Sequence, residues 1–220
     1  MPGTAIRIWT GDAMTLLIFV RHGRTFLPGE PARRIGIRTD LPLTAQGRRE
    51  AQDLVASFMD MPVRAIWSGH LQRSRQTASI LAAGLKVPRP VQALRLLDEI
   101  DHGPDENRTD AEITARIGTA SLAAWNERLA PPHGWDIGSS WRPRGWNRIA
   151  RVLARRPERE CILAVGSQGA IRLAVQSLRD PTHVPAPKLK PGHYGILRLG
   201  GALHADMIAW DRSPSGEAQE

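Results

Sequence analysis

A histidine stands between an arginine and a glycine near the start of the chain, directly after an apolar run. The stretch LLIFVRHGRT covers residues 16–25 and places Arg21, His22 and Gly23 where the apolar run ends. A neutral imidazole can act as a nitrogen nucleophile, and a guanidinium group can hold phosphate oxygens. The three residues therefore predict an anion site that supports nucleophilic chemistry, with a simple surface turn as the alternative interpretation.

The apolar run before Arg21 predicts a β-strand that is covered on both faces. The run is short, contains β-branched and aromatic residues, and does not alternate with polar residues. In open α/β sheets, ligands bind beyond the carboxyl ends of the strands. Arg21 and His22 fall at such an end.

Three further polar groups follow predicted strands. Residues 68–73 follow a strand expected over 64–67, Glu99 follows one expected over 91–97, and residues 166–169 follow one expected over 160–165. Because the carboxyl ends of parallel strands meet at one edge of a sheet, we expect these groups to converge on His22.

The predicted strands alternate with predicted helices. Thr44 is a suitable N-cap, and the residues after it place Ala51, Leu54, Val55 and Phe58 on one helical face. This alternation predicts an α/β fold, a three-layer sandwich with a mostly parallel central sheet and helices on both faces. Helices are expected over 43–58, 71–85 and 169–178 and over most of 110–156 apart from a Trp-rich break at 131–146, and closing strands over 195–199 and 203–210.

The chain of 220 residues, 41% of them hydrophobic, is long enough for one substantial core. We expect one domain over residues 14–211, an N-terminal extension over 1–13 and a disordered tail over 212–220. A translation start at Met14 is the alternative explanation for the extension. Cys161 is the only cysteine, which excludes an internal disulfide and favours a cytoplasmic location.

Arginine supplies most of the positive charge. The formal net charge is +8, and the lysines are Lys86, Lys188 and Lys190. The planar guanidinium fork suits phosphate oxygens, although a general arginine bias of the genome would give the same composition. The arginines are scattered rather than clustered, so we expect no nucleic-acid partner. No apolar run approaches the roughly 20 residues of a membrane span, so we expect no membrane partner.

Five motifs, in order, resemble the histidine phosphatase superfamily, the phosphoglycerate mutase-like proteins, over about residues 14–211. The motifs are FVRHGRT, GIRTDLPLTAQG, IWSGHLQRSRQTA, LLDEIDHG and ILAVGSQGAIR. The resemblance implies the phosphoglycerate mutase-like fold. It also implies phosphoryl transfer through a phosphohistidine on a small phosphorylated substrate, by a monomer or homodimer that needs no metal and no cofactor.

The resemblance implies that His22 is the nucleophile and that Glu99 is the catalytic acid. Glu99 would protonate the departing oxygen and then activate water against the phosphohistidine. This role requires a carboxyl pKa raised toward neutrality. Asp98 and Glu106 are the alternative carboxylates for the same role.

The phosphate contacts implied by the resemblance are Arg21, Gly23 and Arg73. Gly23 has no Cβ, so backbone N–H groups could approach the phosphate closely, and Arg73 begins a helix whose dipole favours an anion. The family has a second histidine in a stretch like SHGG, where this chain has Ser167. Replacing a charge-assisted hydrogen bond by a neutral one commonly costs about 1.5–3 kcal/mol, so we expect slower transfer rather than none.

Candidate substrate contacts complete the predicted site. They are Arg34, Arg38, His70, His102 and Gln168. Two of them, Arg34 and Arg38, lie in a loop where family members contact ligand. The other three could also take the place of the missing histidine, although a surface position is the alternative for both histidines.

These inferences together favour a phosphomonoester hydrolase, because the chain lacks the long insertions expected of a dedicated mutase. The alternatives are an inactive protein that binds a phosphate ester and a phosphotransferase similar to phosphoglycerate mutase. An arginine-driven nucleic-acid binder is a further, separate hypothesis.

Overall fold

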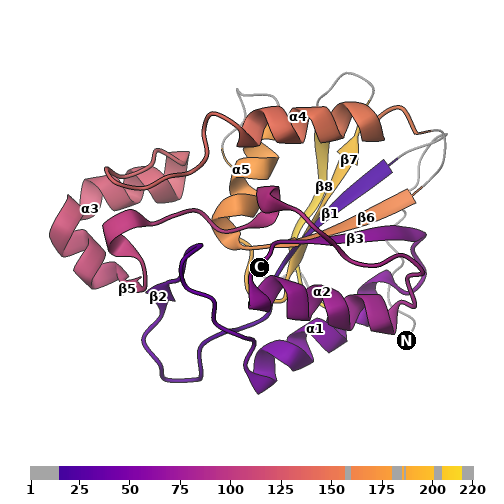
Figure 1. Cartoon of the computed structure of the whole chain (residues 1–220), viewed down its shortest axis with the longest axis horizontal. Helices are drawn as coiled ribbons and strands as arrows, with labels where there is room; N and C mark the ends of the chain where they lie inside the picture. The colour runs from indigo at the N-terminus through magenta and orange to yellow at the C-terminus, as the bar shows by residue number, and fades with distance from the viewer. Residues whose placement is uncertain (1–14, 157–159, 180–184, 186, 201–204, 215–220) are drawn as a thin grey trace.

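A six-stranded, mostly parallel sheet forms the middle layer of the protein (Figure 1). The computed structural model describes residues 15–156, 160–179, 185, 187–200 and 205–214. The strands of this sheet are β1 (Thr15–Arg21), β3 (Val63–Ser68), β4 (Gln92–Ala93), β6 (Glu160–Gly166), β7 (Tyr194–Leu199) and β8 (Ala205–Arg212). Their order is β4-β3-β6-β1-β7-β8, with β4, β3, β6 and β1 parallel and β7 and β8 each antiparallel to a neighbour.

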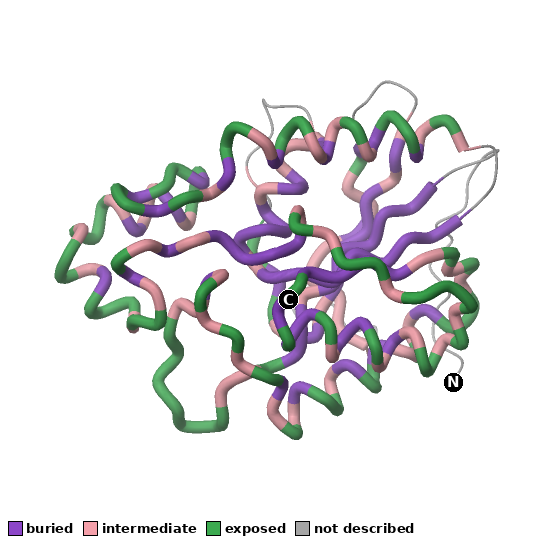
Figure 2. The backbone as a smooth tube through the Cα atoms, in the orientation of Figure 1, coloured by how far each residue is buried: buried purple, intermediate pink, exposed green. Residues whose placement is uncertain are grey.

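Helices cover both faces of this sheet, as the sequence predicts. The helices α1 (Ala45–Phe58) and α2 (Gln72–Gly84) lie on one face, and α4 (Arg142–Leu153) and α5 (Gln168–Leu178) lie on the other (Figure 1). Successive residues of β1 supply the two cores: Ile18 packs with the α1 and α2 side, and Phe19 packs with the α4 and α5 side. Strand β6 is buried throughout and β1 along all but its last residue (Figure 2), which agrees with a three-layer α/β sandwich.

The start of α1 is tied to the segment that follows β1. Thr44 is the N-cap, because its side chain accepts a hydrogen bond from the Gly47 N–H group, as predicted. A Cβ added to Gly47 would lie 2.2 Å from the carbonyl oxygen of Arg24, and one added to Gly23 would lie 2.2 Å from the carbonyl oxygen of Gly47. The two glycines therefore allow a backbone contact that fixes the chain next to His22.

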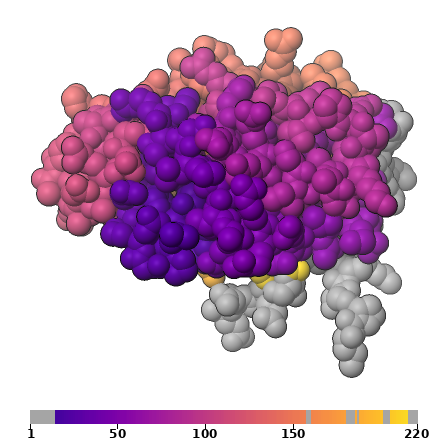
Figure 3. Space-filling view, turned by 60° about the horizontal axis from the view of Figure 1, so that its bottom comes forward, coloured from indigo at the N-terminus to yellow at the C-terminus, as the bar shows by residue number. Residues whose placement is uncertain are grey.

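A smaller unit lies at the carboxyl-end side of the sheet (Figure 1). It contains α3 (Asp110–Arg128) and a two-stranded sheet of β2 (Arg33–Arg34) and β5 (Arg108–Thr109). Its own apolar cluster includes Ile113, Trp125 and Trp135. In Figure 3 the indigo segment that follows β1 lies beside the pink side chains of the α3 region.

The predicted third strand is wrong for most of its length. Of residues 91–97, only β4 pairs with β3, and the chain then forms the short 3-10 helix η1 (Arg95–Leu97). The apolar residues that favoured a strand include Leu97, which instead enters the core from this helical turn. The pairing of β2 with β5 was not predicted, since two-residue strands carry no readable periodicity.

The predicted Trp-rich break at 131–146 ends earlier than expected. Helix α4 begins at Arg142 and accepts Pro143 in its first turn, where a proline costs no hydrogen bond. Trp146 therefore lies in α4, with its ring 5.5 Å from that of Phe19 in the core. At the other end of the chain β8 includes Arg212, one residue beyond the predicted domain, and the predicted extension over 1–13 lies outside the described residues.

The Gly47 contact predicts an unusual sign for a glycine-to-alanine substitution in a helix. At an open helical position this change stabilises a protein by up to about 1 kcal/mol. Gly47→Ala is instead expected to lower the free energy of unfolding by about 1–3 kcal/mol, because the new Cβ meets backbone that cannot rotate away. Urea denaturation measures the change.

Gly145→Ala in α4 is the matched control. A Cβ there would meet only the Leu96 side chain, which can change rotamer. Equal effects of the two substitutions, or a stabilised Gly47→Ala protein, would show that the α1 contact is not a close backbone packing.

Candidate active site

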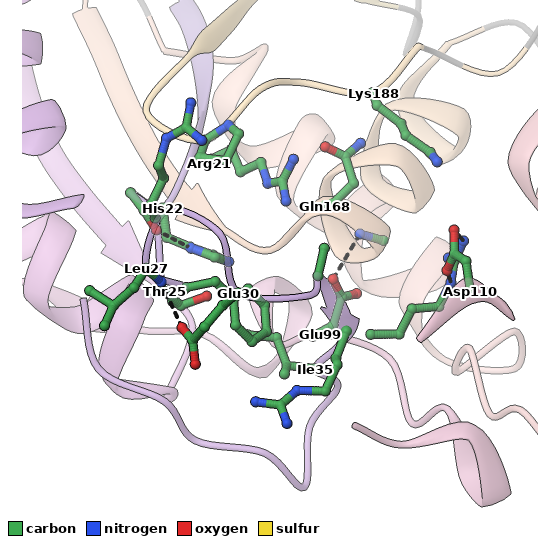
Figure 4. A pocket seen from close by; sticks show the side chains of 18 of the residues that line it. Arg21, His22, Thr25, Leu27, Glu30, Ile35, Glu99, Asp110, Gln168 and Lys188 are labelled. Atoms are coloured by element: carbon green, nitrogen blue, oxygen red, sulfur yellow. Dashed lines mark hydrogen bonds and ion pairs between the residues drawn. The ribbon is translucent and has the colours of Figure 1, made fainter. Parts of the chain in front are cut away.

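A cavity of about 750 Å³ opens at the carboxyl ends of β1 and β6 (Figure 4). Seven of the residues predicted to act in the site line it, among them Arg21, His22, Glu99 and Gln168. These four come from β1, from the segment after η1 and from the first turn of α5. The parallel arrangement of the strands therefore brings these groups together, as expected.

His22 is held by the strand pairing and by its own hydrogen bond. Arg21 lies opposite Gly166 in the parallel pairing of β1 with β6, and the His22 N–H group donates to the Gly166 carbonyl oxygen at 3.2 Å. The ring Nδ1 lies 2.8 Å from the Gly23 carbonyl oxygen. A carbonyl oxygen only accepts, so Nδ1 carries the proton and Nε2 keeps a free lone pair.

The surroundings of His22 keep its ring neutral. Burial and the nearby charges of Arg73 and Arg21 hold the pKa of His22 well below its ordinary value of 6.5, and the hydrogen bond to Gly23 opposes this only in part. The imidazole is 6% exposed, so few water molecules can stabilise a charge on it. His22 is therefore unprotonated, and able to act as a nucleophile, across the neutral and mildly acidic range.

Arg21 and Gln168 share one backbone anchor. An Arg21 Nη1 donates to the Leu189 carbonyl oxygen at 2.7 Å, and the Leu189 N–H group donates to Gln168 Oε1 at 2.9 Å. Both side chains thus reach the cavity from fixed positions (Figure 4). Burial lowers the pKa of Arg21 to about 10, so the guanidinium remains charged at neutral pH.

Glu99 is fixed by two backbone N–H groups. Its Oε1 accepts from Ile100 at 2.9 Å. Its Oε2 accepts from Gly169 at 3.0 Å, the bond drawn at Glu99 in Figure 4. A Cβ on Gly169 would lie 2.3 Å from Glu99 Oε1, so this close approach requires glycine in α5. The two bonds aim the carboxylate into the cavity, on the same side as His22.

The rival carboxylates have other partners. Asp98 Oδ2 lies 2.9 Å from His70 Nδ1, which directs this side chain away from the cavity. Glu106 Oε1 accepts from the Gly36 N–H group at 2.8 Å and from the Thr39 hydroxyl group at 2.7 Å. Neither of these carboxylates lines the cavity, whereas Glu99 does, so Glu99 remains the candidate for the catalytic acid.

Arg73 differs from the prediction in the direction of its guanidinium group. The side chain is completely buried and does not line the cavity. Its Nη1 donates to the Thr39 carbonyl oxygen at 2.7 Å, and its Nη2 donates to those of Ile35 and Gly36 at 3.2 and 3.3 Å. Arg73 therefore acts on His22 through its charge, rather than presenting its fork to the cavity.

Gly23 and Ser167 also differ in their contacts. The Gly23 N–H group donates to Thr77 Oγ1 at 3.2 Å, so it is not free to bind a ligand, although Gly23 lines the cavity. Ser167 directly follows β6 and is the N-cap of α5. Its hydroxyl group is buried and has no hydrogen-bond partner among the described residues.

The candidate substrate contacts divide into two groups. Arg34, His102 and Gln168 line the cavity, whereas Arg38 and His70 do not. Arg38 is bonded to the Gly103 carbonyl oxygen and lies 3.1 Å from Asp101, outside the cavity. His102 is buried edge-on against Trp135, with ring centres 4.5 Å apart, which favours a packing role in the wall.

Sequence reasoning missed several residues that the structure places at the site. Arg142 is buried and donates to the carbonyl oxygens of Leu96, Asp98 and Glu99, so it positions the backbone of the acid. Arg172 and Lys188 line the cavity. The only signal for Arg172 was its place in the ILAVGSQGAIR motif, and Lys188 gave no signal at all.

Two further properties follow from the described part of the chain. Within it, no three or more histidine, cysteine, aspartate or glutamate side chains are grouped so that they could hold a metal ion. None of the described helices combines the length and the apolar character needed to cross a membrane.

Comparisons with known sequences give one family. A sequence model of the histidine phosphatase superfamily (branch 1) matches residues 17–201. A 2,3-bisphosphoglycerate-dependent phosphoglycerate mutase 2 of Gloeobacter violaceus is 30% identical over 127 residues, which cover 56% of this chain and 57% of that protein. A Yersinia enterocolitica protein named "Probable phosphoglycerate mutase GpmB" is 26% identical over 230 aligned positions. The match covers 90% of this chain and 98% of that protein.

Solved structures with the same fold include phosphatases. A mycobacterial glucosyl-3-phosphoglycerate phosphatase superimposes with a TM-score of 0.74 at 22% identity, covering 90% of this chain and 99% of that one. The alpha-ribazole phosphatase of Shigella flexneri superimposes with a TM-score of 0.67 at 21% identity, covering 93% of this chain and 100% of that one.

The neutral state of His22 can be checked directly by nitrogen-15 NMR. At about pH 6 an ordinary imidazole is mostly protonated, but the lowered pKa of His22 keeps its ring neutral. We expect one proton-bearing nitrogen, assigned to Nδ1, and one bare nitrogen, assigned to Nε2. His22→Gln identifies the signals, and two proton-bearing nitrogens at this pH would contradict the assignment.

Proposed function

We propose that this chain, which belongs to the histidine phosphatase superfamily, hydrolyses small phosphomonoesters through a phosphohistidine on His22. The observation that carries the proposal is the hydrogen bond from His22 Nδ1 to the Gly23 carbonyl oxygen, which leaves Nε2 free in a cavity that Glu99 also lines. Nucleophile, positive charge and proton donor are all present in one place.

The first step forms the phosphohistidine. The Nε2 lone pair attacks phosphorus, a nitrogen–phosphorus bond forms, and the bond between phosphorus and the ester oxygen breaks. Protonated Glu99 transfers its proton to the departing oxygen, which leaves as an alcohol. In the second step Glu99 takes a proton from water, the resulting hydroxide attacks phosphorus, and the nitrogen–phosphorus bond breaks to release phosphate.

Positive charge supports the transferring phosphoryl group from two directions. Arg21 lines the cavity and is held at a fixed position by the Leu189 carbonyl oxygen, so its remaining N–H groups are available to the phosphoryl oxygens. Arg73 contributes through its buried charge near His22, which both disfavours imidazolium and attracts an anion. The N-terminus of α5 adds a favourable dipole at the same edge of the sheet.

We assign Ser167 to the position of the family's second histidine. The assignment is supported by the ILAVGSQGAIR motif and by the place of Ser167 directly after Gly166, whose carbonyl oxygen accepts from the His22 N–H group. Ser167 is buried and does not line the cavity, so its hydroxyl group would have to turn toward the cavity to donate one neutral hydrogen bond to the phosphoryl group. The neighbouring Gln168, with its Oε1 held by Leu189, offers a second neutral donor through Nε2.

Hydrolysis rather than mutase activity is our choice for the reaction. The relatives that match by sequence are named mutases, and the similar solved structures include phosphatases. Hydrolysis also agrees with the expectation from the sequence that the chain lacks the long insertions of a dedicated mutase. We further propose a cytoplasmic protein, since Cys161 is the only cysteine of the sequence and the chain therefore has no internal disulfide.

A phosphoenzyme trap tests the proposal. Wild-type protein mixed with a phosphorus-32-labelled aryl phosphate and quenched in base is expected to retain label, which acid then releases. His22→Ala should retain none and should lose at least about 10³-fold in kcat, because His102, the other histidine of the described cavity lining, is packed against Trp135.

His133→Ala is the matched control, because His133 is an exposed histidine that does not line the cavity. It should label as the wild type does. If the wild-type protein binds phosphate tightly but neither labels nor turns over, the chain is a phosphate-ester-binding protein and not a phosphatase.

Ser167→His tests the assignment of this position. A histidine would restore a charge-assisted hydrogen bond, which is worth about 1–2 kcal/mol more than a neutral one, so we expect kcat to rise about 10-fold. Steady-state rates with the same aryl phosphate measure the change, with Ser167→Ala as the reference that has no donor. A Ser167→His protein that folds but turns over more slowly than Ser167→Ala would overturn the assignment.

A further inference from the structure

Three positive side chains from different segments line the cavity away from His22. They are Arg34 of β2, Arg172 of α5 and Lys188, which precedes β7. In Figure 4, Lys188 and Asp110 lie at one end of the cavity and His22 at the other, with Glu99 and Gln168 between them. Arg34 is bonded to Asp110 and therefore belongs to the same end as Lys188. A phosphoryl group at His22 would lie at the opposite end from Lys188.

Both arginines of this group are fixed by neighbours. Arg34 binds Asp110 through two hydrogen bonds of 2.7 and 3.2 Å, and its guanidinium group lies 5.7 Å from the centre of the Trp135 ring. Arg172 is 2% exposed, and its Nη2 donates to the Asn126 carbonyl oxygen at 2.6 Å. These contacts hold the two charges in place before any ligand arrives.

Lys188 lacks such a neutralising contact. Among the described residues, no carboxylate oxygen lies within 4.0 Å of its ammonium group. Lys188 is an exposed residue, but partial desolvation lowers the pKa of its ammonium group. The charges of Arg34, Arg172 and Arg21 lower it further, while Asp110 opposes them. Burial, and then the charge of Arg34, also lower the pKa of Arg172. Asp110, the carboxylate at this end, already binds Arg34. Positive charge therefore exceeds negative charge at this end of the cavity.

We propose that Lys188, together with Arg34 and Arg172, forms a second anion subsite that selects phosphomonoesters whose leaving group carries a carboxylate or a second phosphate. The proposal rests on the proposed function, which places the phosphoryl group at His22. A cavity of about 750 Å³ has room for a leaving group between the two ends. The apolar Ile35 and Trp125 line the same cavity, so the middle of the leaving group meets a partly apolar wall.

The test is a series of substrates that differ only in the far group. Alkyl monophosphates of increasing chain length are compared, ending in a hydroxyl group, a carboxylate or a second phosphate. The ratio of kcat/KM between anion-ended and hydroxyl-ended substrates should exceed 10-fold at one preferred chain length, because the two sites lie at a fixed separation. Comparing the carboxylate-ended with the phosphate-ended substrates shows which anion the subsite prefers.

Lys188→Met should reduce that ratio about 10-fold, mainly through KM, and Lys188→Arg should retain most of it. Lys86→Met is the matched control, because Lys86 is an exposed lysine that does not line the cavity. A ratio near one at every chain length, or a ratio that Lys188→Met leaves unchanged, would overturn the subsite.

Binding separates this proposal from the proposed function. Alkyl phosphonates that end in a carboxylate or a hydroxyl group cannot be hydrolysed at the carbon–phosphorus bond, and their affinities are measured by calorimetry. If no phosphomonoester is turned over but the carboxylate-ended phosphonate still binds more tightly, and Lys188→Met removes the difference, the proposed function fails and the subsite stands. If the two phosphonates bind with equal affinity and phosphomonoesters are turned over, the subsite fails and the proposed function stands.

Discussion

A neutral imidazole buried beside two guanidinium groups is the constraint on which the site depends. Burial and the charges of Arg73 and Arg21 disfavour protonation of His22, so Nε2 keeps its lone pair. The same two guanidinium charges are costly to bury without an anion beside them. Among the described carboxylates, that of Glu99 stabilises both charges most. The free site therefore favours the arrival of an anion that can accept attack from nitrogen.

Backbone carbonyl oxygens offset much of that cost and also set the geometry. Arg21 binds the carbonyl oxygen of Leu189, Arg73 binds those of residues 35, 36 and 39, and Arg142 binds those of residues 96, 98 and 99. Each arginine thus fixes a loop that belongs to the cavity wall. The rigidity of these loops comes from buried charge, not from regular secondary structure.

The layered sheet and the smaller unit around α3 divide the cavity between them. The sheet places His22, Glu99 and the first turn of α5 at its carboxyl edge, where close glycine contacts at Gly23, Gly47 and Gly169 hold the backbone. The α3 unit adds Asp110 and Trp125, and β2 adds Arg34. The sheet thus contributes the proposed nucleophile and acid, and the smaller unit contributes part of the opposite wall.

The sequence by itself determined the layered fold, because helical and strand periodicity follow from the local spacing of apolar residues, as in β1 and α1. It also determined that His22 and Gln168 converge, since they follow β1 and β6, whose carboxyl ends must meet. Glu99 reaches the same place by another route, from the segment after η1. Only the tertiary structure decided the direction of the Arg73 guanidinium, the Thr77 bond of Gly23, the pairing of β2 with β5 and the place of Lys188. These features depend on backbone groups distant in sequence, such as the Leu189 peptide, and local periodicity carries no record of such contacts.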